Sequence, residues 1–274
     1  MLTSRRPLVA ALVTFLAAAL ALTGCSSNKG ATVDGVKILK KGTLQVCTHL
    51  PYKPFQFRDS SGHIVGFDVD LIELVAKRLK LKQETVDVDW NQVTSGAAFK
   101  ASKCDLGMGG MTITAERAKS ILISEPYFNA TQAMLVKKGS AYKSLADLKG
   151  KKLGAQSDTT GLKYAQDHAK QYGYTIINFD DFSIEVNAVK AGTIDAAIND
   201  NGVLYSFAKD SPTTTVAVEF NTGEKYGFAA KRDDANATKL MNMLNQEITK
   251  SRSDGEYKKI YQKWFGTVPG NVNK

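Results

Sequence analysis

The chain has few of the residues that build metal centres and disulfide frameworks. Its 274 residues include only three cysteines and three histidines. The histidines are His49, His63 and His168, far apart in the sequence, and no cysteine–histidine cluster has the spacing of a zinc site. We therefore predict no metal and no cofactor.

Catalytic and nucleic-acid motifs are also missing. The sequence has no G-x-S-x-G nucleophile elbow, no phosphate-binding loop and no H-E-x-x-H pair. The formal net charge is +9, but the lysines and arginines are scattered singly among acidic residues. Because no basic run is interleaved with aromatics and no known module is present, we expect no nucleic-acid role.

The one long apolar run lies at the start of the chain. Arg5 and Arg6 precede Leu8–Leu22, which is rich in alanine and leucine. The run is too short to span a bilayer comfortably, since about 20 apolar residues are needed. A basic start followed by a short apolar stretch is typical of a secretory signal peptide.

The end of this run predicts how the protein is processed. Leu22-Thr23-Gly24-Cys25 resembles the lipobox of bacterial lipoproteins. The resemblance implies a signal peptide at residues 1–24, a lipid on Cys25 and a lipidated tether over residues 25–35. A plain signal peptide with a chance cysteine is the alternative.

Two cysteines remain after Cys25. Cys47 lies in a strand-like run at 44–50, and Cys104 opens another at 105–108. Outside the cell paired thiols tend to oxidise. A disulfide is feasible if the two strands are neighbours, and two buried free thiols are the alternative.

Short apolar strands alternate with amphipathic helices along the chain, which predicts an α/β fold. The predicted strands are 44–50, 83–88, 105–110, 131–137, 152–155, 175–179, 194–198 and 225–230. The predicted helices are 70–81, 97–102, 160–172, 184–191 and 254–265.

Polar residues follow several of these strands, where open α/β sheets bind ligands. After the strand at 105–110, Gly110 allows close backbone approach, Thr112 offers a hydroxyl, and Arg117 offers a planar fork that fits a carboxylate. A surface arginine is the alternative for Arg117. Asp200 follows another strand and suits an ammonium group, or else serves as a loop or capping acid.

Other candidates have equally plain structural alternatives. Thr159 and Thr160 stand where a helix start could hold an anion, or simply cap the helix. Tyr52 and Trp90 could enclose an aliphatic stem or belong to the core. His49, at the end of the first strand, is either a ligand contact or structural.

Seven pieces of the chain occur in a familiar order and spacing. Together they resemble extracellular solute-binding protein family 3, the polar amino-acid binding proteins of ABC importers, over residues 36–268. The pieces are Pro51–Phe55, Val65–Leu71, Gly110–Arg117, Ser124–Phe128, Asp147–Lys151, Asp195–Asp200 and Gly255–Gly266.

The resemblance implies a two-lobe, type II periplasmic-binding-protein-like fold. Two hinge strands join the α/β lobes, and the ligand cleft lies between them. The implied first lobe comprises residues 36–130 plus 228–274, and the inserted second lobe residues 138–222. The hinge strands would be residues 131–137 and 223–227.

The resemblance also implies which residues hold the backbone of an amino acid. Its α-carboxylate would be bound by Arg117, Thr159 and Thr160, while Gly110 would supply a backbone acceptor and Thr112 a donor or acceptor. Its α-ammonium would be received by Asp200, and its stem would lie against Tyr52 and Trp90.

The ligand side chain would face His49, Gln156 and Asn199. None of the three is acidic, so a cationic side chain would be buried without a partner, which is costly. A side-chain carboxylate could accept hydrogen bonds from all three. We therefore expect an acidic amino acid or its amide, with glutamate ahead of glutamine.

The resemblance implies a binding protein, not an enzyme. We expect a monomer, anchored by lipid to the outer face of the cell membrane, that delivers a free amino acid to the permease of an ABC importer. The alternative is a secreted enzyme on the same fold, such as a cyclohexadienyl dehydratase.

Overall fold

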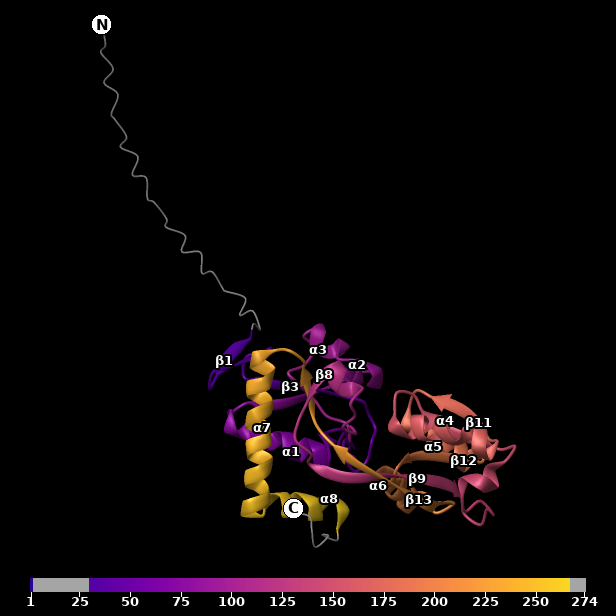
Figure 1. The fold of residues 1–274 in the computed structure, drawn as a ribbon. Helices are drawn as coiled ribbons and strands as arrows, with labels where there is room; N and C mark the ends of the chain where they lie inside the picture. Colours follow the sequence, from indigo (N-terminus) through magenta and orange to yellow (C-terminus); the bar gives the residue numbers. More distant parts are fainter. Residues whose placement is uncertain (2–29, 267–274) are drawn as a thin grey trace.

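The chain folds around two five-stranded sheets joined by long strands (Figure 1). The structure is a computed structural model that describes Met1 and residues 30–266. The predicted signal peptide and Cys25 lie outside the described residues. The mixed α/β class and the two-lobe arrangement agree with the sequence analysis.

The first sheet has the order β6-β3-β7-β14-β8. Its strands are β3 (Thr43–Thr48), β6 (Lys82–Asp87), β7 (Leu106–Gly107), β8 (Ile121–Ile123) and β14 (Ala229–Lys231). Its helices are α1 (Phe67–Arg78), α2 (Trp90–Thr94), α3 (Ala97–Lys100), η1 (Arg117–Lys119), α7 (Ala235–Asp254) and α8 (Glu256–Phe265). Because β14 and the last two helices come from the end of the chain, both ends of the described chain build this lobe.

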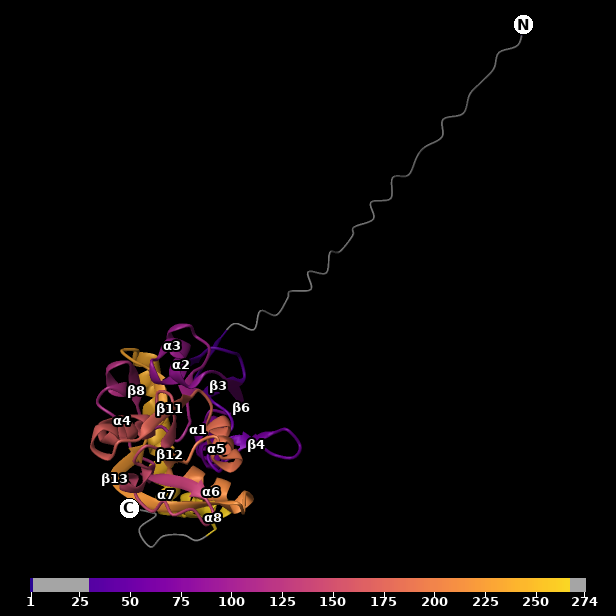
Figure 2. The same cartoon turned by 90° about the vertical axis from the view of Figure 1, so that its right-hand side faces the viewer.

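Two small hairpins extend the first lobe. One pairs β1 (Ala31–Val33) with β2 (Val36–Ile38). The other pairs β4 (Phe57–Arg58) with β5 (Ile64–Val65) and projects from the body of the protein (Figure 2).

The second sheet has the order β11-β10-β12-β9-β13. Its strands are β9 (Phe128–Lys137), β10 (Lys152–Gln156), β11 (Thr175–Phe179), β12 (Ala196–Asp200) and β13 (Thr214–Tyr226). Its helices are η2 (Leu145–Leu148), α4 (Thr160–Tyr172), α5 (Phe182–Ala191) and α6 (Asn201–Asp210). The strands β10, β11 and β12 are parallel, and β9 and β13 run antiparallel to their neighbours.

Both faces of the second sheet are buried. Met134 and Val136 belong to the cluster that α4 covers, whereas the alternate residues Ala133 and Leu135 pack with residues of α5 and α6. Side chains alternate between the two faces of a strand, so burial on both sides requires a continuous apolar run such as the one in β9.

The two predicted hinge strands fall almost entirely on the long strands β9 and β13. Gln132–Val136 pairs residue by residue with β12, and β13 runs alongside β9 with two register shifts. Residues 132–136 thus belong to the second sheet itself. The lobe boundaries remain a prediction, and this pairing favours a first crossover at the start of β9.

Several predicted elements match the structure and others do not. The predicted helix 160–172 and strand 175–179 have the observed bounds. The predicted helix 70–81 instead starts at Phe67, because Gly66 precedes a first turn whose Phe67 and Asp68 are buried. Asp70, at which the predicted helix began, therefore lies within the observed helix.

Among the longer elements, α6 and α7 were not predicted, and only the last residues of β13 fall within a predicted strand. Helix α7 is twenty residues long, and its buried Leu240, Leu244 and Ile248 recur at helical spacing. The sequence therefore contained the pattern of an amphipathic helix here, although most residues of this segment are polar.

The first lobe contains a disulfide between Cys47 and Cys104. Cys47 lies on β3, whose neighbour β7 begins two residues after Cys104. Both cysteines are buried in a cluster that includes Val93 and Phe99. The covalent bond thus ties the central strand to the segment that leads toward Gly110.

Replacing Cys47 and Cys104 together by alanine is expected to lower the free energy of unfolding by about 2–4 kcal/mol. The bond closes a long loop, with a sequence separation of 57 residues. Denaturant titration of the variant, and of the reduced wild type as a second form without the bond, measures the loss. If unreduced, denatured wild-type protein alkylates at both cysteines, the bond is absent in solution.

Candidate ligand-binding site

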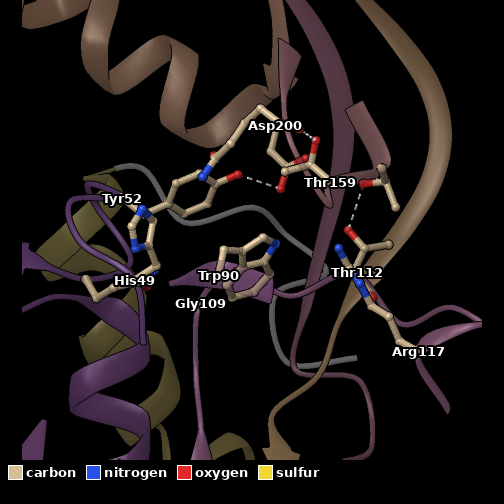
Figure 3. A pocket seen from close by; sticks show the side chains of 12 residues that line it. His49, Tyr52, Trp90, Gly109, Thr112, Arg117, Thr159 and Asp200 are labelled. Carbon is tan, nitrogen blue, oxygen red and sulfur yellow. Dashed lines mark hydrogen bonds between the residues drawn. The ribbon is translucent and has the colours of Figure 1, made fainter. Parts of the chain in front are cut away.

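A cavity between the lobes gathers ten of the eleven predicted ligand-binding residues (Figure 3). It is lined by His49, Tyr52, Gln56, Trp90, Gly109, Gly110, Thr112, Arg117, Gln156, Thr159, Thr160 and Asp200. The predicted residue that does not line it is Asn199. The cavity volume is about 30 Å³, room for only a water molecule or two. An amino acid therefore enters only when the lobes part or side chains move.

The floor of the cavity is a glycine pair held by a buried acid. The amide groups of Gly109 and Gly110 donate to Asp68 Oδ2 at 3.1 and 2.9 Å, and Tyr127 donates to the same oxygen. Burial raises the pKa of Asp68 to about 6, and these hydrogen bonds oppose the rise. A Cβ on Gly109 would lie 2.5 Å from Trp90, and one on Gly110 2.9 Å from Tyr52. Only glycine fits beneath the two aromatic rings.

Arg117 lies at one end of the cavity. Its two terminal nitrogens donate to the carbonyl oxygens of Thr112 at 2.9 Å and Asp158 at 2.8 Å. The guanidinium carbon lies 5.6 Å from the centre of the Trp90 ring. Burial lowers the pKa of Arg117 from its usual value, and the negative charge of Asp200 opposes that change. An arginine remains charged in such surroundings, so the cavity has a fixed cation.

Threonine hydroxyls lie beside Arg117. The hydroxyl of Thr112, from the first lobe, lies 3.3 Å from that of Thr160, from the second. The Thr159 hydroxyl accepts a hydrogen bond from the backbone amide of Leu162 at 3.1 Å and so caps the start of α4. Its capping role is therefore evident, while Thr112 and Thr160 present hydroxyls between the lobes.

Asp200 lies at the opposite side of the cavity, at the carboxyl end of β12 (Figure 3). The hydroxyl groups of Tyr52 and Tyr226 and the side-chain amide of Gln132 contact its carboxylate. Burial, followed by the negative charge of Glu224, raises the pKa of Asp200 to about 7. A ligand cation beside this carboxylate would favour its ionised form.

Asn199 lies behind the cavity and contacts its wall. Its side-chain oxygen lies 2.8 Å from the Tyr52 hydroxyl, and its amide donates to Glu185 at 2.9 Å. Glu185 is fully buried in α5, and burial raises its pKa to about 8. Asn199 is therefore placed to orient Tyr52, whereas its predicted contact with the ligand side chain remains untested.

The two lobes meet directly around the cavity. Asp158, in the second lobe, offers one carbonyl oxygen to both Arg117 and the Trp90 ring nitrogen, the latter at 3.2 Å. Its backbone is left-handed, with φ of 59°, which aspartate tolerates better than most residues. His49 Nε2 lies 3.5 Å from Asp181 Oδ2 across the cleft. The lobes are thus in contact over the site.

The arrangement suits a small zwitterion. Arg117 and the nearby hydroxyls can receive a carboxylate, Asp200 can receive an ammonium group, and Tyr52 and Trp90 bound the space between. Within the described part of the chain, no group of three or more His, Cys, Asp or Glu residues is placed to hold a metal ion. In the same residues, no helix is long and apolar enough to cross a membrane.

Residues 44–267 match the family described as bacterial extracellular solute-binding proteins, family 3. The chain belongs to this family. Membership of this extracellular family places the protein outside the cytoplasm.

Similar proteins are named for the amino acids they bind. A probable histidine-binding protein of Neisseria gonorrhoeae is 32% identical over 93% of this chain and 95% of its own. The structure of an ancestral arginine-binding protein bound to arginine is 39% identical, with a TM-score of 0.76 over 82% of this chain and 99% of that one. An ancestral amino acid-binding protein, described as a precursor of cyclohexadienyl dehydratase, is 37% identical, with a TM-score of 0.74 over 82% and 96%.

Some residues of this family 3 site were not predicted. Gln56 and Gly109 line the cavity. Gln132 and Glu224 lie behind it and contact the lining residues Asp200 and Thr160, respectively. Gly109 belongs to a glycine pair that is visible in the sequence. Gln132 and Glu224 lie on β9 and β13, where strand alternation does not indicate which lobe a side chain approaches.

Proposed function

We propose that the protein captures a polar amino acid outside the cytoplasm and delivers it to the permease of an ABC importer. The observation that carries the proposal is the opposition of Arg117 and Asp200 across one enclosed cavity. Two opposite charges set apart in this way match the two charges common to all free α-amino acids. Membership of solute-binding family 3 supports the importer as the partner.

A ligand screen tests this function. The protein without its signal peptide is mixed with each common amino acid, and the melting temperature is recorded. A ligand that binds only the folded state raises the apparent melting temperature by mass action. We expect stabilisation by one or a few polar amino acids, and titration calorimetry then gives the affinity. If no amino acid stabilises the protein or binds in calorimetry, the proposal is wrong.

A parallel incubation, with a cyclohexadienyl acid as well as the amino acid found in the screen, tests the enzyme alternative. After incubation the ligand is released by denaturation and its mass is measured. A binding protein returns the amino acid unchanged. Time-dependent loss of water or carbon dioxide from a cyclohexadienyl acid would favour the dehydratase instead.

The identity of the ligand side chain is a finer question. The sequence prediction of glutamate or glutamine rests on the absence of acidic groups among His49, Gln156 and Asn199. A cavity of about 370 Å³ adjoins the candidate site at His49 and Trp90. Four aspartates line it: Asp89, Asp158, Asp180 and Asp181.

These aspartates oppose a second negative charge on the ligand. Like charges that lack a cation between them destabilise a complex. Within this proposal, glutamine and cationic amino acids therefore rank above glutamate, in line with relatives named for histidine and arginine. Calorimetry with glutamate, glutamine, arginine and histidine at one pH gives the order. Tightest binding to glutamate would support the original prediction and oppose this ranking.

The lipid anchor is part of the same proposal. The Leu22–Cys25 tetrapeptide supports attachment of a lipid to Cys25. A Cys25→Ser variant should leave the membrane fraction, while the wild type stays in it. Equal retention of both proteins in washed membranes would contradict the anchor. Monomeric behaviour of the mature protein is expected and is checked by size-exclusion chromatography with light scattering.

A further inference from the structure

Glu224 is an acid at the junction of the lobes that the proposed function does not use. It lies on β13, two residues before Tyr226. One of its carboxylate oxygens accepts hydrogen bonds from the Thr112 hydroxyl at 2.8 Å and from the Thr160 hydroxyl at 3.1 Å. Gln132 donates to both oxygens at 3.1 Å. Glu224 thus contacts groups from both lobes at once.

The groups that Glu224 contacts matter for the ligand. Thr112 and Thr160 are two of the residues proposed to bind the α-carboxylate, and Glu224 already presents a carboxylate to them. The negative charge of Glu224 also acts on Arg117. Its effect is the second largest, after that of Asp200, among the charges that oppose the lowering of the Arg117 pKa by burial. The α-carboxylate of a ligand would find both hydroxyls already donating to Glu224, and the negative charge of Glu224 would repel it.

We infer that Glu224 is a built-in competitor for the α-carboxylate of the ligand, which must release Thr112 and Thr160 before an amino acid binds. The inference rests on the proposed function. Glu224 satisfies the two hydroxyls and joins the lobes through them. Glu224 then limits the affinity of the site.

The first test is the affinity of Glu224→Gln for the amino acid found in the screen. The substitution keeps the size of the side chain and removes its charge. We expect binding about tenfold tighter than in the wild type, the size of one hydrogen bond to a charged group. Glu219→Gln is the matched control, an exposed acid on the same strand that contacts Asn201 and Tyr205. Its affinity should equal that of the wild type.

A ligand without an α-carboxylate sharpens the test. The α-amide of the same amino acid keeps the ammonium group and the side chain. If Glu224 competes with the carboxylate, Glu224→Gln does not tighten binding of the amide. Weaker or unchanged binding of the amino acid itself in Glu224→Gln would overturn the inference, and equal tightening for both ligands would also do so.

A measurement without ligand separates this inference from the proposed function. The carboxylate of Asp200 accepts hydrogen bonds from three side chains, which are Tyr52, Gln132 of β9 and Tyr226 of β13. The other charged or titratable groups around it are Glu224, Glu185 and Arg117. Its raised pKa means that folding binds a proton, so its contribution to stability is present below about pH 4 and is lost toward pH 7. Besides burial, the charge of Glu224 contributes to the raised pKa of Asp200, so its removal should reduce the loss of stability between pH 4 and pH 7. The free energy of unfolding of Glu224→Gln should therefore rise relative to wild type between pH 4 and pH 7.

The outcomes remain distinguishable. Failure of the wild type to bind any amino acid removes the proposed function, while the pH dependence of unfolding still reports on Glu224. Binding by the wild type with no gain in Glu224→Gln removes only the inference. An unchanged difference in unfolding free energy across this pH range would show that the charge of Glu224 has no effect at this junction, and would overturn the electrostatic repulsion proposed between Glu224 and the ligand carboxylate.

Discussion

Arg117→Ala is expected to abolish measurable amino-acid binding while the protein stays folded. Arg117 is the cation that lines the cavity beside Thr112. Removing one partner of a buried, hydrogen-bonded charge pair costs about 2–5 kcal/mol, a loss of roughly 30-fold to several thousand-fold in affinity. Isothermal titration with the ligand from the screen measures it.

Two further variants define the role of Arg117. Arg117→Lys keeps the charge but loses the planar fork, so its affinity should fall between those of Ala and wild type. Arg58→Ala, in the exposed β4–β5 hairpin, is the control and should bind normally. The contact of Arg117 with Asp158 is shared with Trp90, so far-ultraviolet circular dichroism of Arg117→Ala should match the wild type. Near-normal affinity in this variant would remove Arg117 from the site.

Asp200→Asn is expected to weaken binding by a comparable amount and to change its pH dependence. Asp200 must be ionised to pair with an ammonium group, and its pKa in the free protein is raised to about 7. The affinity of the wild type should therefore fall as the pH is lowered from 7 to 5. Because asparagine does not titrate, the residual binding of the variant should be nearly independent of pH over this range.

Calorimetry at pH 5, 6 and 7 tests this expectation. Asp167→Asn is the control, since Asp167 lies exposed on α4 and pairs with Lys163. That variant should keep both the affinity and the pH dependence of the wild type. A wild-type affinity that does not change between pH 5 and pH 7 would mean that Asp200 is ionised throughout or does not contact the ligand.

The sequence predicted the helices and strands best where a pattern was long and its ends were marked. Helix α4 follows a threonine cap and ends at Gly173, which has the left-handed backbone that glycine adopts readily. The strand β11 follows directly. Helix α7 was not predicted although its apolar residues recur at helical spacing. The predicted start of α1, at Asp70, lies three residues after the observed start at Phe67.

The sequence also predicted where most of the site would form. His49 follows β3, while Gln156 and Asp200 end β10 and β12. Residues at the carboxyl ends of parallel strands share one edge of a sheet, so the convergence of Gln156 and Asp200 in the second sheet follows from the pattern of strands, while His49 lies at that edge of the first sheet. The motif Gly110–Arg117 belongs to the same edge of the first sheet.

The tertiary structure alone decided which polar groups meet between the lobes. Gln132 reaches Asp200 because β9 and β12 pair with these two residues opposite each other. Glu224 reaches Thr112 and Thr160 because β13 continues from one lobe toward the other after a register shift. Neither contact has a signal in local sequence, since strand alternation fixes only the face of a side chain.

What the sequence by itself determined is the α/β class, the resemblance to the family, and the charged residues that suit a free amino acid. These depend on local periodicity and on motifs whose order along the chain is visible. What only the tertiary structure decided is the environment of those charges: the aspartates beyond His49, the burial that raises the pKa of Asp200, and the carboxylate of Glu224 at the threonines. The physical reason is that burial and electrostatic coupling depend on distances between residues far apart in the chain, which the packing of two lobes sets.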